Sequence, residues 1–511
     1  TWMLTADCFL GLRSLLLIVW QSVAYCLEVW DIAVIFVVGK DEGCLRRQYP
    51  EICRFCHTFC FMKGIRFYQC LALCLLGGAF VPVQGQTSGE MVDYFVQQLE
   101  GGQQVAPVQQ SDKVKISRLA QRRSEVWNAW QEANRLLDEP VLPALSVQKP
   151  VVADSILLPD TLEPSAVMNY YWVQKGDAAS DGGWPVFIYL HGSGPRDREW
   201  STGLKLAQQF DDAPSRYFVP RIPNEGAYYR WWQRSKQWTW NWLLRRLMLD
   251  DSVNARRLYV FGISEGGYGS QRLASFYADY WAAAGPMAGG EPLKNAPAEN
   301  CRNIGFSLLT GADDTGFYRN QLSRLVSDAF DSLQTVFTDG FKHRIELIPG
   351  RGHHIDYRPT TPWLKTFSRN PWPRHFLWED FEMDGWHRNG FYNLAVEKRP
   401  CDTLRTRYRM DIADNRIELS VDNVHYQTVE RDSVWGIELR FAKTYTPATG
   451  GALTLFLNEH LVDLSKPVTV VVNGKEVFRG KVTCRVGSMM RSLCLFYDRE
   501  RIFPAEVEVR Y

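Results

Sequence analysis

The chain has 511 residues, of which 46% are hydrophobic and 23% are charged, and its formal net charge is +1. This length is enough for two or three domains, and this apolar content is enough to bury a full core. A protein whose main partner is nucleic acid needs clustered Lys and Arg side chains that neutralise phosphates. Because the charges nearly balance and no basic block occurs, we expect no nucleic-acid partner.

The first 85 residues differ in composition from the rest of the chain. Eight of the 12 cysteines lie within the first 74 residues. Residues 62–85 start at Met62, continue through a short basic stretch and an apolar run, and end in a plausible cleavage site, which is the pattern of a secretory signal peptide. Since such a peptide stands at an N-terminus, we expect translation to start at Met62 and residues 1–61 to be an untranslated upstream segment. The mature protein would begin near Gln86 and be exported, to the periplasm or the medium.

Two patterns in this upstream segment have an interpretation of their own. Residues 53–57 read Cys-x-x-Cys-His, a c-type haem attachment motif, and together with Cys60 they also resemble a metal site. The apolar run 15–37 has the length of a membrane span, although acidic residues interrupt it. We favour the interpretation that this segment is never made. We therefore expect no haem, no metal and no stable membrane span in the mature chain.

Residues 86–150 are predicted to form an N-terminal tail and one amphipathic helix. Residues 86–110 are rich in Gln, Gly and Ser, which is typical of a mobile terminus. Between 111 and 138 the apolar residues recur at helical spacing, and Pro140 ends the run. We expect this helix to pack on the domain that follows.

Between residues 151 and 400, short apolar runs alternate with helical stretches. This alternation predicts a mostly parallel sheet with helices on both faces. The predicted strands are 166–174, 186–190, 258–261, 304–309 and 344–348. In such sheets, ligands bind at the carboxyl ends of the strands. The candidate site therefore lies in the loops that start at His191, Gly262, Thr310 and Pro349.

The loop after strand 258–261 reads Gly262-Ile-Ser264-Glu-Gly266, and a helix-forming stretch follows it. A strand, a sharp turn and a helix form the context in which Gly-x-Ser-x-Gly exposes a serine at the end of a sheet. The flanking glycines leave room for the strained turn, and a helix N-terminus stands behind the serine. This pattern predicts Ser264 as a catalytic nucleophile.

A serine hydroxyl needs a base that takes its proton. His353 follows Gly352 in the loop after the last predicted strand and is the first candidate, with His354 as the alternate. The base needs a carboxylate that fixes its tautomer. The loop after strand 304–309 offers Asp314, with Asp313 as the alternate, because adjacent acids cannot be separated without geometry.

The tetrahedral intermediate of acyl transfer also needs N–H donors for its oxyanion. Strand 186–190 ends in a His-Gly-Ser-Gly loop. The backbone N–H of Gly192 or Ser193 can therefore pair with that of Glu265, the residue after the nucleophile. We interpret His191 as structural rather than catalytic.

These motifs resemble the α/β-hydrolase superfamily. They are Leu190-His-Gly-Ser-Gly194, Gly262-Ile-Ser-Glu-Gly-Gly267, Gly311-Ala-Asp-Asp314 and Gly352-His353, in the chain order Ser, Asp, His. The stretch 264–285 is similar to the branch of esterase D, feruloyl esterases and polyhydroxybutyrate depolymerases. The resemblance covers about residues 150–395 and implies an α/β-hydrolase sheet, a Ser-His-Asp triad, and chemistry without cofactor or metal.

The loop 199–242 is longer and more aromatic than that branch usually shows. Its aromatic and basic residues near the nucleophile strand include Tyr228, Tyr229, Trp231, Trp232, Trp238, Trp240, Trp242, Arg221, Arg230 and Arg234. In one interpretation Trp231, Trp232 and Arg230 line the substrate cleft, where rings stack on a sugar or an aromatic acyl group and arginines bind a carboxylate. In the other, a helix over 238–249 packs these rings into the core. The sequence supports both interpretations equally.

Residues 401–511 have the pattern of a separate antiparallel β domain. Apolar and polar residues alternate over 416–421, 435–441 and 453–457. The pair Asn473-Gly474 separates two further apolar runs and is typical of a type I′ hairpin turn, which needs positive φ at both positions.

The sequence as a whole predicts an exported serine hydrolase that cleaves a small-molecule or glycan-linked carboxylic ester through an acyl-enzyme. One alternative is a serine peptidase of the prolyl oligopeptidase type, which shares the triad order but usually carries an N-terminal propeller that residues 86–150 are too few to form. The other is a non-catalytic glycan-binding protein on the same fold. The sequence leaves the oligomeric state and the natural substrate open.

Overall fold

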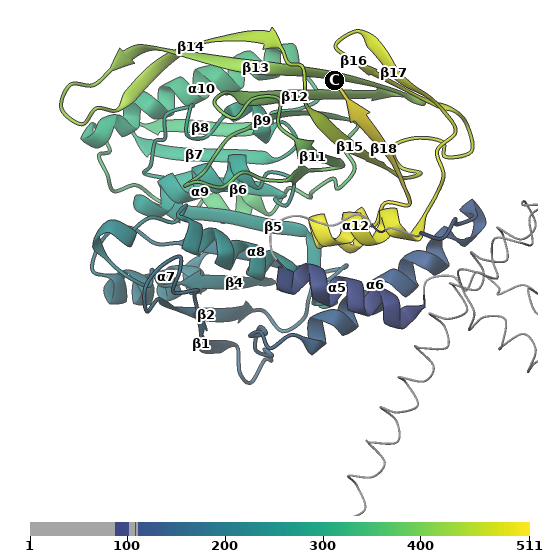
Figure 1. The fold of residues 1–511 in the computed structure, drawn as a ribbon. Helices are drawn as coiled ribbons and strands as arrows, with labels where there is room; N and C mark the ends of the chain where they lie inside the picture. The colour runs from purple at the N-terminus through teal and green to yellow at the C-terminus, as the bar shows by residue number, and fades with distance from the viewer. Residues whose placement is uncertain (1–86, 102–107, 109–110) are drawn as a thin grey trace, which may run out of the picture. The chain divides into compact units, whose positions relative to one another are not determined.

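The computed structural model describes residues 87–101, 108 and 111–511. Residues Gly85–Tyr511 form one compact unit, and its described part is the coloured ribbon of Figure 1. The signal peptide predicted at 62–85 and the haem, metal and span motifs of residues 1–61 lie outside the described residues. They stay predictions.

An eight-stranded sheet occupies the centre of Figure 1, in the order β1-β2-β4-β3-β5-β6-β7-β8. Its strands are β1 (Val151–Leu157), β2 (Val167–Lys175), β3 (Trp184–Leu190), β4 (Ser215–Pro220), β5 (Val253–Ile263), β6 (Ala283–Met287), β7 (Gly305–Gly311) and β8 (His343–Ile348). The pairs β1–β2 and β2–β4 are antiparallel, and every other pair is parallel. The predicted, mostly parallel sheet is confirmed. The strands β1, β4 and β6 were not among the predicted strands.

Helices cover both faces of this sheet. They are α7 (Arg196–Gln209), α8 (Arg234–Leu249), α9 (Glu265–Phe276), α10 (Arg319–Val336) and α11 (Thr360–Leu364). All seven residues of β3 are buried, because successive side chains of a strand point to opposite faces and both faces are covered here. Ile188 packs in a cluster with residues of α8, α9 and α10. Its neighbour Phe187 packs in a second cluster with residues of α7 and α11.

Two helices precede the sheet, α5 (Ser88–Gly101) and α6 (Leu119–Leu136). The prediction of a mobile tail over 86–110 is wrong where α5 lies. Phe95 of α5 is fully buried, and its ring meets Trp130 of α6 edge-on at 5.1 Å between centroids. A sequence signal for α5 exists in the capping box of Thr87 and Glu90, in which the Glu90 N–H donates to Thr87 Oγ1 and the Thr87 N–H donates to Glu90 Oε2.

The C-terminal β region contains two sheets and one helix. The six-stranded sheet consists of β9 (His375–Asp380), β12 (Arg405–Ala413), β13 (Arg416–Arg431), β14 (Glu438–Pro447), β16 (Val468–Val472) and β17 (Lys475–Gly480). The four-stranded sheet consists of β10 (Gly390–Phe391), β11 (Leu394–Lys398), β15 (Ala452–Leu457) and β18 (Ala505–Arg510). Helix α12 spans Val486–Phe496. Short 3-10 turns in the described chain include η1 (Ile116–Arg118), η2 (Gly226–Tyr228), η3 (Ala298–Cys301), η4 (Gly316–Tyr318) and η5 (Arg499–Arg501).

The predicted start of this β region at residue 401 is too late. Strand β9 pairs with β12, and β11 pairs with β15, so both sheets use strands from before that position. The pairings are antiparallel as predicted, except that β13 and β16 are parallel. The Asn473-Gly474 turn has φ of 48° and 79°, which confirms the predicted turn chemistry.

Buried ion pairs join the β region to the segments that follow α9 and α11, and the region is not a separate compact unit. Asp279, which follows α9, pairs with Arg388 at 2.6 Å and with Arg501 at 2.7 Å. Arg369 pairs with Asp498 at 2.7 Å, and both side chains are almost fully buried. Removing one partner of such a pair leaves an uncompensated buried charge, which is strongly destabilising.

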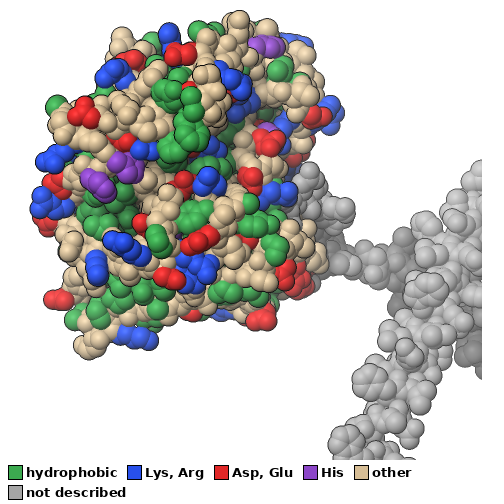
Figure 2. Space-filling view, turned by 90° about the vertical axis from the view of Figure 1, so that its left-hand side faces the viewer, with side chains coloured by type: hydrophobic (Ala, Val, Ile, Leu, Met, Phe, Trp, Pro, Cys, Tyr) green, Lys and Arg blue, Asp and Glu red, His purple; other side chains and the backbone are tan. Residues whose placement is uncertain are grey.

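Three general findings bear on function. None of the helices in the described part of the chain has the length and apolarity that a membrane crossing requires. The described residues contain no cluster of three or more His, Cys, Asp or Glu able to hold a metal ion, and Cys301, Cys401, Cys484 and Cys494 are free thiols. On the face drawn in Figure 2, basic and acidic side chains are interspersed, with small hydrophobic patches between them.

Candidate active site

Ser264 occupies the turn between β5 and α9. Its backbone has φ of 60° and ψ of −113°, and its N–H donates to the carbonyl of Met287 at 2.9 Å. A non-glycine residue in such a conformation costs about 1–3 kcal/mol, which the surrounding structure must supply. Here the strand before Ser264 and the helix after it are both fixed to the sheet, and together they hold the strained turn.

The glycines of the Gly-x-Ser-x-Gly motif are required by close packing. A Cβ atom at Gly266 would overlap the carbonyl oxygen of Leu190, and one at Gly262 would overlap the carbonyl oxygen of Gly266. Only a residue without a side chain fits where the backbone of β3, the turn and α9 come so close together. The turn has the strand–turn–helix geometry that presents a serine at the end of a sheet.

His353 lies between Ser264 and Asp314. Its Nε2 is 3.0 Å from Ser264 Oγ, and its Nδ1 is 2.8 Å from Asp314 Oδ2. In the neutral imidazole, Nδ1–H donates to the carboxylate, and Nε2 accepts from the serine hydroxyl. His353 stands in the loop after β8 and Asp314 in the loop after β7, so the three residues meet at the carboxyl ends of parallel strands.

The two alternate candidates for the acid and the base lie outside this hydrogen-bonded set. The side chains of Asp313 and His354 are exposed, whereas that of Asp314 is 3% exposed. The backbone N–H of Asp313 donates to the carbonyl of Arg351, which fixes this residue at the surface of the loop. Within each adjacent pair, one side chain points inward and the other points to solvent.

Arg319, at the start of α10, also binds Asp314. Its Nε and Nη2 donate to the two carboxylate oxygens at 2.8 and 2.6 Å. Burial alone would raise the pKa of Asp314, but the hydrogen bonds from Arg319 and His353 hold that pKa below its usual value. The carboxylate is therefore charged when His353 becomes protonated. The sequence analysis missed Arg319, and an arginine five residues after the acid, at a helix start, is a weak signal by itself.

Two of the three candidate oxyanion residues, Glu265 and Gly192, adjoin Ser264. Glu265 is the first residue of α9, where the N–H groups of a helix have no partner within the helix. Gly192 lies beside the nucleophile, since a Cβ at Gly192 would be 3.5 Å from Ser264 Cβ. Gly192 is buried, and Ser193 after it is exposed.

His191 is a buried structural residue. Its Nε2 accepts from the N–H of Ile222 at 3.1 Å, so the ring proton is on Nδ1, which donates to the carbonyl of Gly192 at 2.7 Å. Burial lowers the pKa of His191 to about 4. These bonds hold the loop that carries Gly192.

His191 should therefore make the protein sensitive to acid. The folded-state pKa lies below the ordinary value of 6.5, so the unfolded chain binds more protons as the pH falls from 6.5 toward 4. The stabilisation is complete above pH 6.5 and is lost in that window. Between pH 7 and 4.5 the loss should be about 2 kcal/mol from this residue. Urea unfolding at pH 7 and pH 4.5 measures this loss as a decrease in the free energy of unfolding. The decrease should be smaller by about 2 kcal/mol in His191→Gln than in the wild type. An equal decrease in the two proteins would refute the assignment.

In the aromatic loop 199–242, some side chains are buried in the core and others line a cavity. Trp231 is fully buried, and its Nε1 donates to the carbonyl of His191 at 3.0 Å, so its predicted place in the cleft is wrong. Trp232 and Arg230, on either side, line a cavity of about 420 Å³. Trp240 and Trp242 of α8 are buried in the core.

This cavity begins at α9 and extends to the β region. Its lining includes Glu265, Tyr268 and Arg272 of α9. The opposite side is formed by the loop between β13 and β14, with Trp435 and Ile437 among its residues. Glu265 directly follows Ser264 in the chain, so the cavity borders the turn that carries the candidate nucleophile, and Ser264 itself is not among its lining residues.

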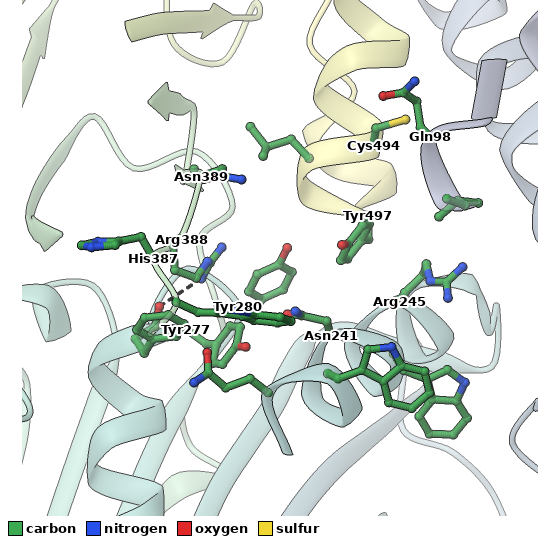
Figure 3. A pocket seen from close by; sticks show the side chains of 18 of the residues that line it. Gln98, Asn241, Arg245, Tyr277, Tyr280, His387, Arg388, Asn389, Cys494 and Tyr497 are labelled. Atoms are coloured by element: carbon green, nitrogen blue, oxygen red, sulfur yellow. Dashed lines mark hydrogen bonds between the residues drawn. The ribbon is translucent and has the colours of Figure 1, made fainter. Parts of the chain in front are cut away.

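Figure 3 shows a different pocket, of about 270 Å³. Tyr277 and Tyr280 lie on one side of it, and Cys494 and Tyr497 on the other. None of its lining residues lies in the loops that carry Ser264, Asp314 and His353, whereas the cavity of about 420 Å³ includes Glu265 and Phe317 from next to them. We therefore place the candidate active site at Ser264.

The topology and the turn at Ser264 define the class of fold. A serine on the strand–helix turn of a mostly parallel sheet, followed in the chain by the acid and then the histidine, is the arrangement of α/β hydrolases. The described domain has the α/β-hydrolase fold.

Comparisons with known proteins give the following matches. No protein-family model and no curated protein matches the chain. Among solved structures, it is similar to a thermostable esterase, with 19% identity over 43% of this chain and 64% of that chain and a TM-score of 0.33. A putative dipeptidyl aminopeptidase IV from Bacteroides ovatus matches at 13% identity over 42% and 34%, with a TM-score of 0.32. A CE1 ferulic acid esterase from Anaeromyces mucronatus, in complex with ferulic acid, matches at 15% over 44% and 93%, with a TM-score of 0.30. The chain thus spans less than two thirds of the first two proteins.

Proposed function

We propose that this protein is a serine hydrolase that cleaves carboxylic esters of small molecules or glycans. The observation that carries the proposal is the position of His353, within hydrogen-bonding distance of both Ser264 Oγ and the Asp314 carboxylate. We also propose export, which rests on the signal-peptide pattern of residues 62–85 alone.

In the proposed reaction, Ser264 Oγ attacks the ester carbonyl while His353 Nε2 takes the hydroxyl proton. Asp314 stabilises the imidazolium that forms. The backbone N–H of Glu265, with that of Gly192 or Ser193, donates to the oxyanion. The intermediate collapses as His353 gives its proton to the leaving alcohol. Water then attacks the acyl-enzyme while His353 takes a proton from the water. His353 returns this proton to Ser264 Oγ as the carboxylic acid leaves.

Labelling tests this proposal directly. The full chain should react with a fluorophosphonate probe, and peptide mass spectrometry should place the adduct on Ser264. It should also release p-nitrophenol from p-nitrophenyl acetate. The Ser264→Ala protein is the matched control and should show neither. A folded wild type without label and turnover would refute the hydrolase proposal, and a glycan affinity kept in both proteins would then favour the binding-protein alternative.

The peptidase alternative receives less support. Of residues 86–150, the described part contains the helices α5 and α6 and no β-propeller. Turnover of ester but not of peptide substrates by the labelled protein would separate the two activities.

A further inference from the structure

The loop between β13 and β14 reaches the surroundings of the triad. We call residues 431–438 the hairpin tip. Figure 1 shows β13 and β14 extending over α10. Tyr318 of η4 donates its hydroxyl to Asp432 at 2.6 Å, and the rings of Phe317 and Trp435 lie 4.9 Å apart. The hairpin tip is therefore fixed to the segment that directly precedes Arg319.

The hairpin tip closes the cavity that begins at Glu265. From this loop, Arg431, Trp435 and Ile437 line the cavity, and they face the α9 side chains across it. Removing the tip would turn the cavity into an open surface beside Ser264. The C-terminal β region thus supplies one wall of the space next to the nucleophile.

The charges in the cavity lining are paired with one another. Arg272 binds Glu291 through two hydrogen bonds of 2.8 and 3.0 Å, and Arg431 binds Glu438 at 2.8 Å. The remaining pair is Arg230 and Glu265, at 3.6 Å. With three arginines and three glutamates, the lining has no excess positive charge for a ligand carboxylate or phosphate. This balance favours a neutral ligand over the carboxylate that the sequence analysis considered for these arginines.

Two features of the lining leave room for further contacts with a ligand. Glu265 Oε1 is buried and accepts no hydrogen bond from the protein, because its ion-pair partner Arg230 is 3.6 Å away. Most buried polar atoms do have a hydrogen-bond partner. Burial raises the pKa of Glu265 to about 7, so near neutral pH this carboxyl group can donate as well as accept. Across the cavity, Trp435 is 62% exposed and Phe317 is 47% exposed.

One class of ligand satisfies both features. A neutral ring can stack on the exposed indole of Trp435. A hydroxyl group on that ring can hydrogen-bond to Glu265, which stands beside Ser264. Trp232 is less available for stacking, because the guanidinium of Arg272 lies 3.9 Å from its ring centre.

We infer that the hairpin tip is part of the substrate-binding site and that Trp435 and the Glu265 side chain determine specificity for a neutral, hydroxyl-bearing ring on the ester. A phenolic ring and a pyranose share this chemistry. The inference rests on the proposed function, because it assigns the subsite of that reaction.

Binding to the Ser264→Ala protein tests the inference without turnover. Isothermal titration would compare 4-hydroxybenzyl acetate and a 6-O-acetyl methyl glucoside with two reference esters, benzyl acetate and 4-carboxybenzyl acetate. At least one hydroxylated ester should bind about tenfold more tightly than benzyl acetate. The carboxylated ester should bind more weakly than either. The hydroxylated ester that binds more tightly shows whether the preferred ring is phenolic or a pyranose.

Variants at the hairpin tip make the test specific. In the Ser264→Ala background, Trp435→Ala should weaken binding of the preferred ester about tenfold. Val434→Ala is the matched control, because Val434 is a neighbouring exposed side chain outside the lining, and it should change the affinity less than about twofold. Glu265→Leu should remove the preference for the hydroxyl group, and Glu265→Gln should retain part of it. Thermal unfolding checks that each variant folds.

The outcomes separate the two proposals. If Trp435→Ala leaves the affinity unchanged, or if the carboxylated ester binds most tightly, the inference is wrong whether or not Ser264 is labelled. If none of the esters binds, it is also wrong. If the hydroxylated ester binds as expected but the wild type shows no label and no turnover, the subsite stands and the hydrolase proposal fails.

Discussion

Replacing His353 with alanine should lower kcat for ester hydrolysis by about 10⁶-fold, close to the loss expected for Ser264→Ala. The two losses should be similar because nucleophile and base act as one unit, so that removing either leaves only binding and the oxyanion donors. In this protein the unit is joined by the 3.0 Å contact of His353 Nε2 with Ser264 Oγ. Steady-state hydrolysis of p-nitrophenyl acetate measures both losses.

His354→Ala is the matched control for this experiment. His354 has the same side chain one position later, but it is exposed. We expect its replacement to change kcat by less than about twofold, as for a surface substitution away from the chemistry. A large loss in His354→Ala with activity retained in His353→Ala would reverse the assignment. The double variant should lose no more than His353→Ala alone.

Replacing Asp314 with asparagine should lower kcat by about 10⁴-fold, since an amide in this place favours the wrong tautomer of the histidine. The Asp314 carboxylate accepts from His353 Nδ1 at 2.8 Å. An asparagine can present an N–H group there, which makes Nδ1 an acceptor and leaves the proton on Nε2. The ring can then no longer take the proton of Ser264. The measurement is again kcat on p-nitrophenyl acetate.

Asp313→Asn is the control, and its kcat should stay within about twofold of the wild type. Thermal unfolding must accompany the Asp314 variant, because Arg319 then loses the anionic partner of its two hydrogen bonds. Removing one charged partner of a buried ion pair lowers the free energy of unfolding by about 3–5 kcal/mol. An Asp314→Asn protein that folds and keeps its activity, beside an inactive Asp313→Asn protein, would move the triad acid to Asp313.

Arg319 links the candidate triad to the C-terminal β region. It binds Asp314 on one side, and the two residues before it, Phe317 and Tyr318, have the left-handed φ values of 51° and 60°. Two successive aromatic residues in this conformation are strained. Their contacts with Trp435 and Asp432 of the hairpin tip help to hold the turn that presents Arg319. The β region, for which the sequence suggested a separate domain, thus borders the site.

The features that the sequence predicted are those that depend on local chain chemistry. The turn at Ser264 needs two glycines, a preceding strand and a following helix, and all of these are contiguous in the chain. The mostly parallel sheet follows from apolar runs that alternate with helices, and this topology brings the loops with Ser264, Asp314 and His353 to the same edge. The type I′ turn at Asn473 depends only on two residues that tolerate positive φ.

The features that the sequence could not predict depend on which way a side chain points and on what lies across from it. Asp313 and Asp314, like His353 and His354, are chemically identical neighbours, and only the path of the folded loop turns one of each pair toward Ser264. The same holds for Trp231, which is in the core, and Trp232, which is in the cavity. The hairpin tip lies more than 160 residues from Ser264 in the chain. Local sequence therefore determined the candidate nucleophile. Only tertiary packing decided the candidate base, the candidate acid and the wall of the cavity, because long-range contacts leave no periodic pattern in either segment alone.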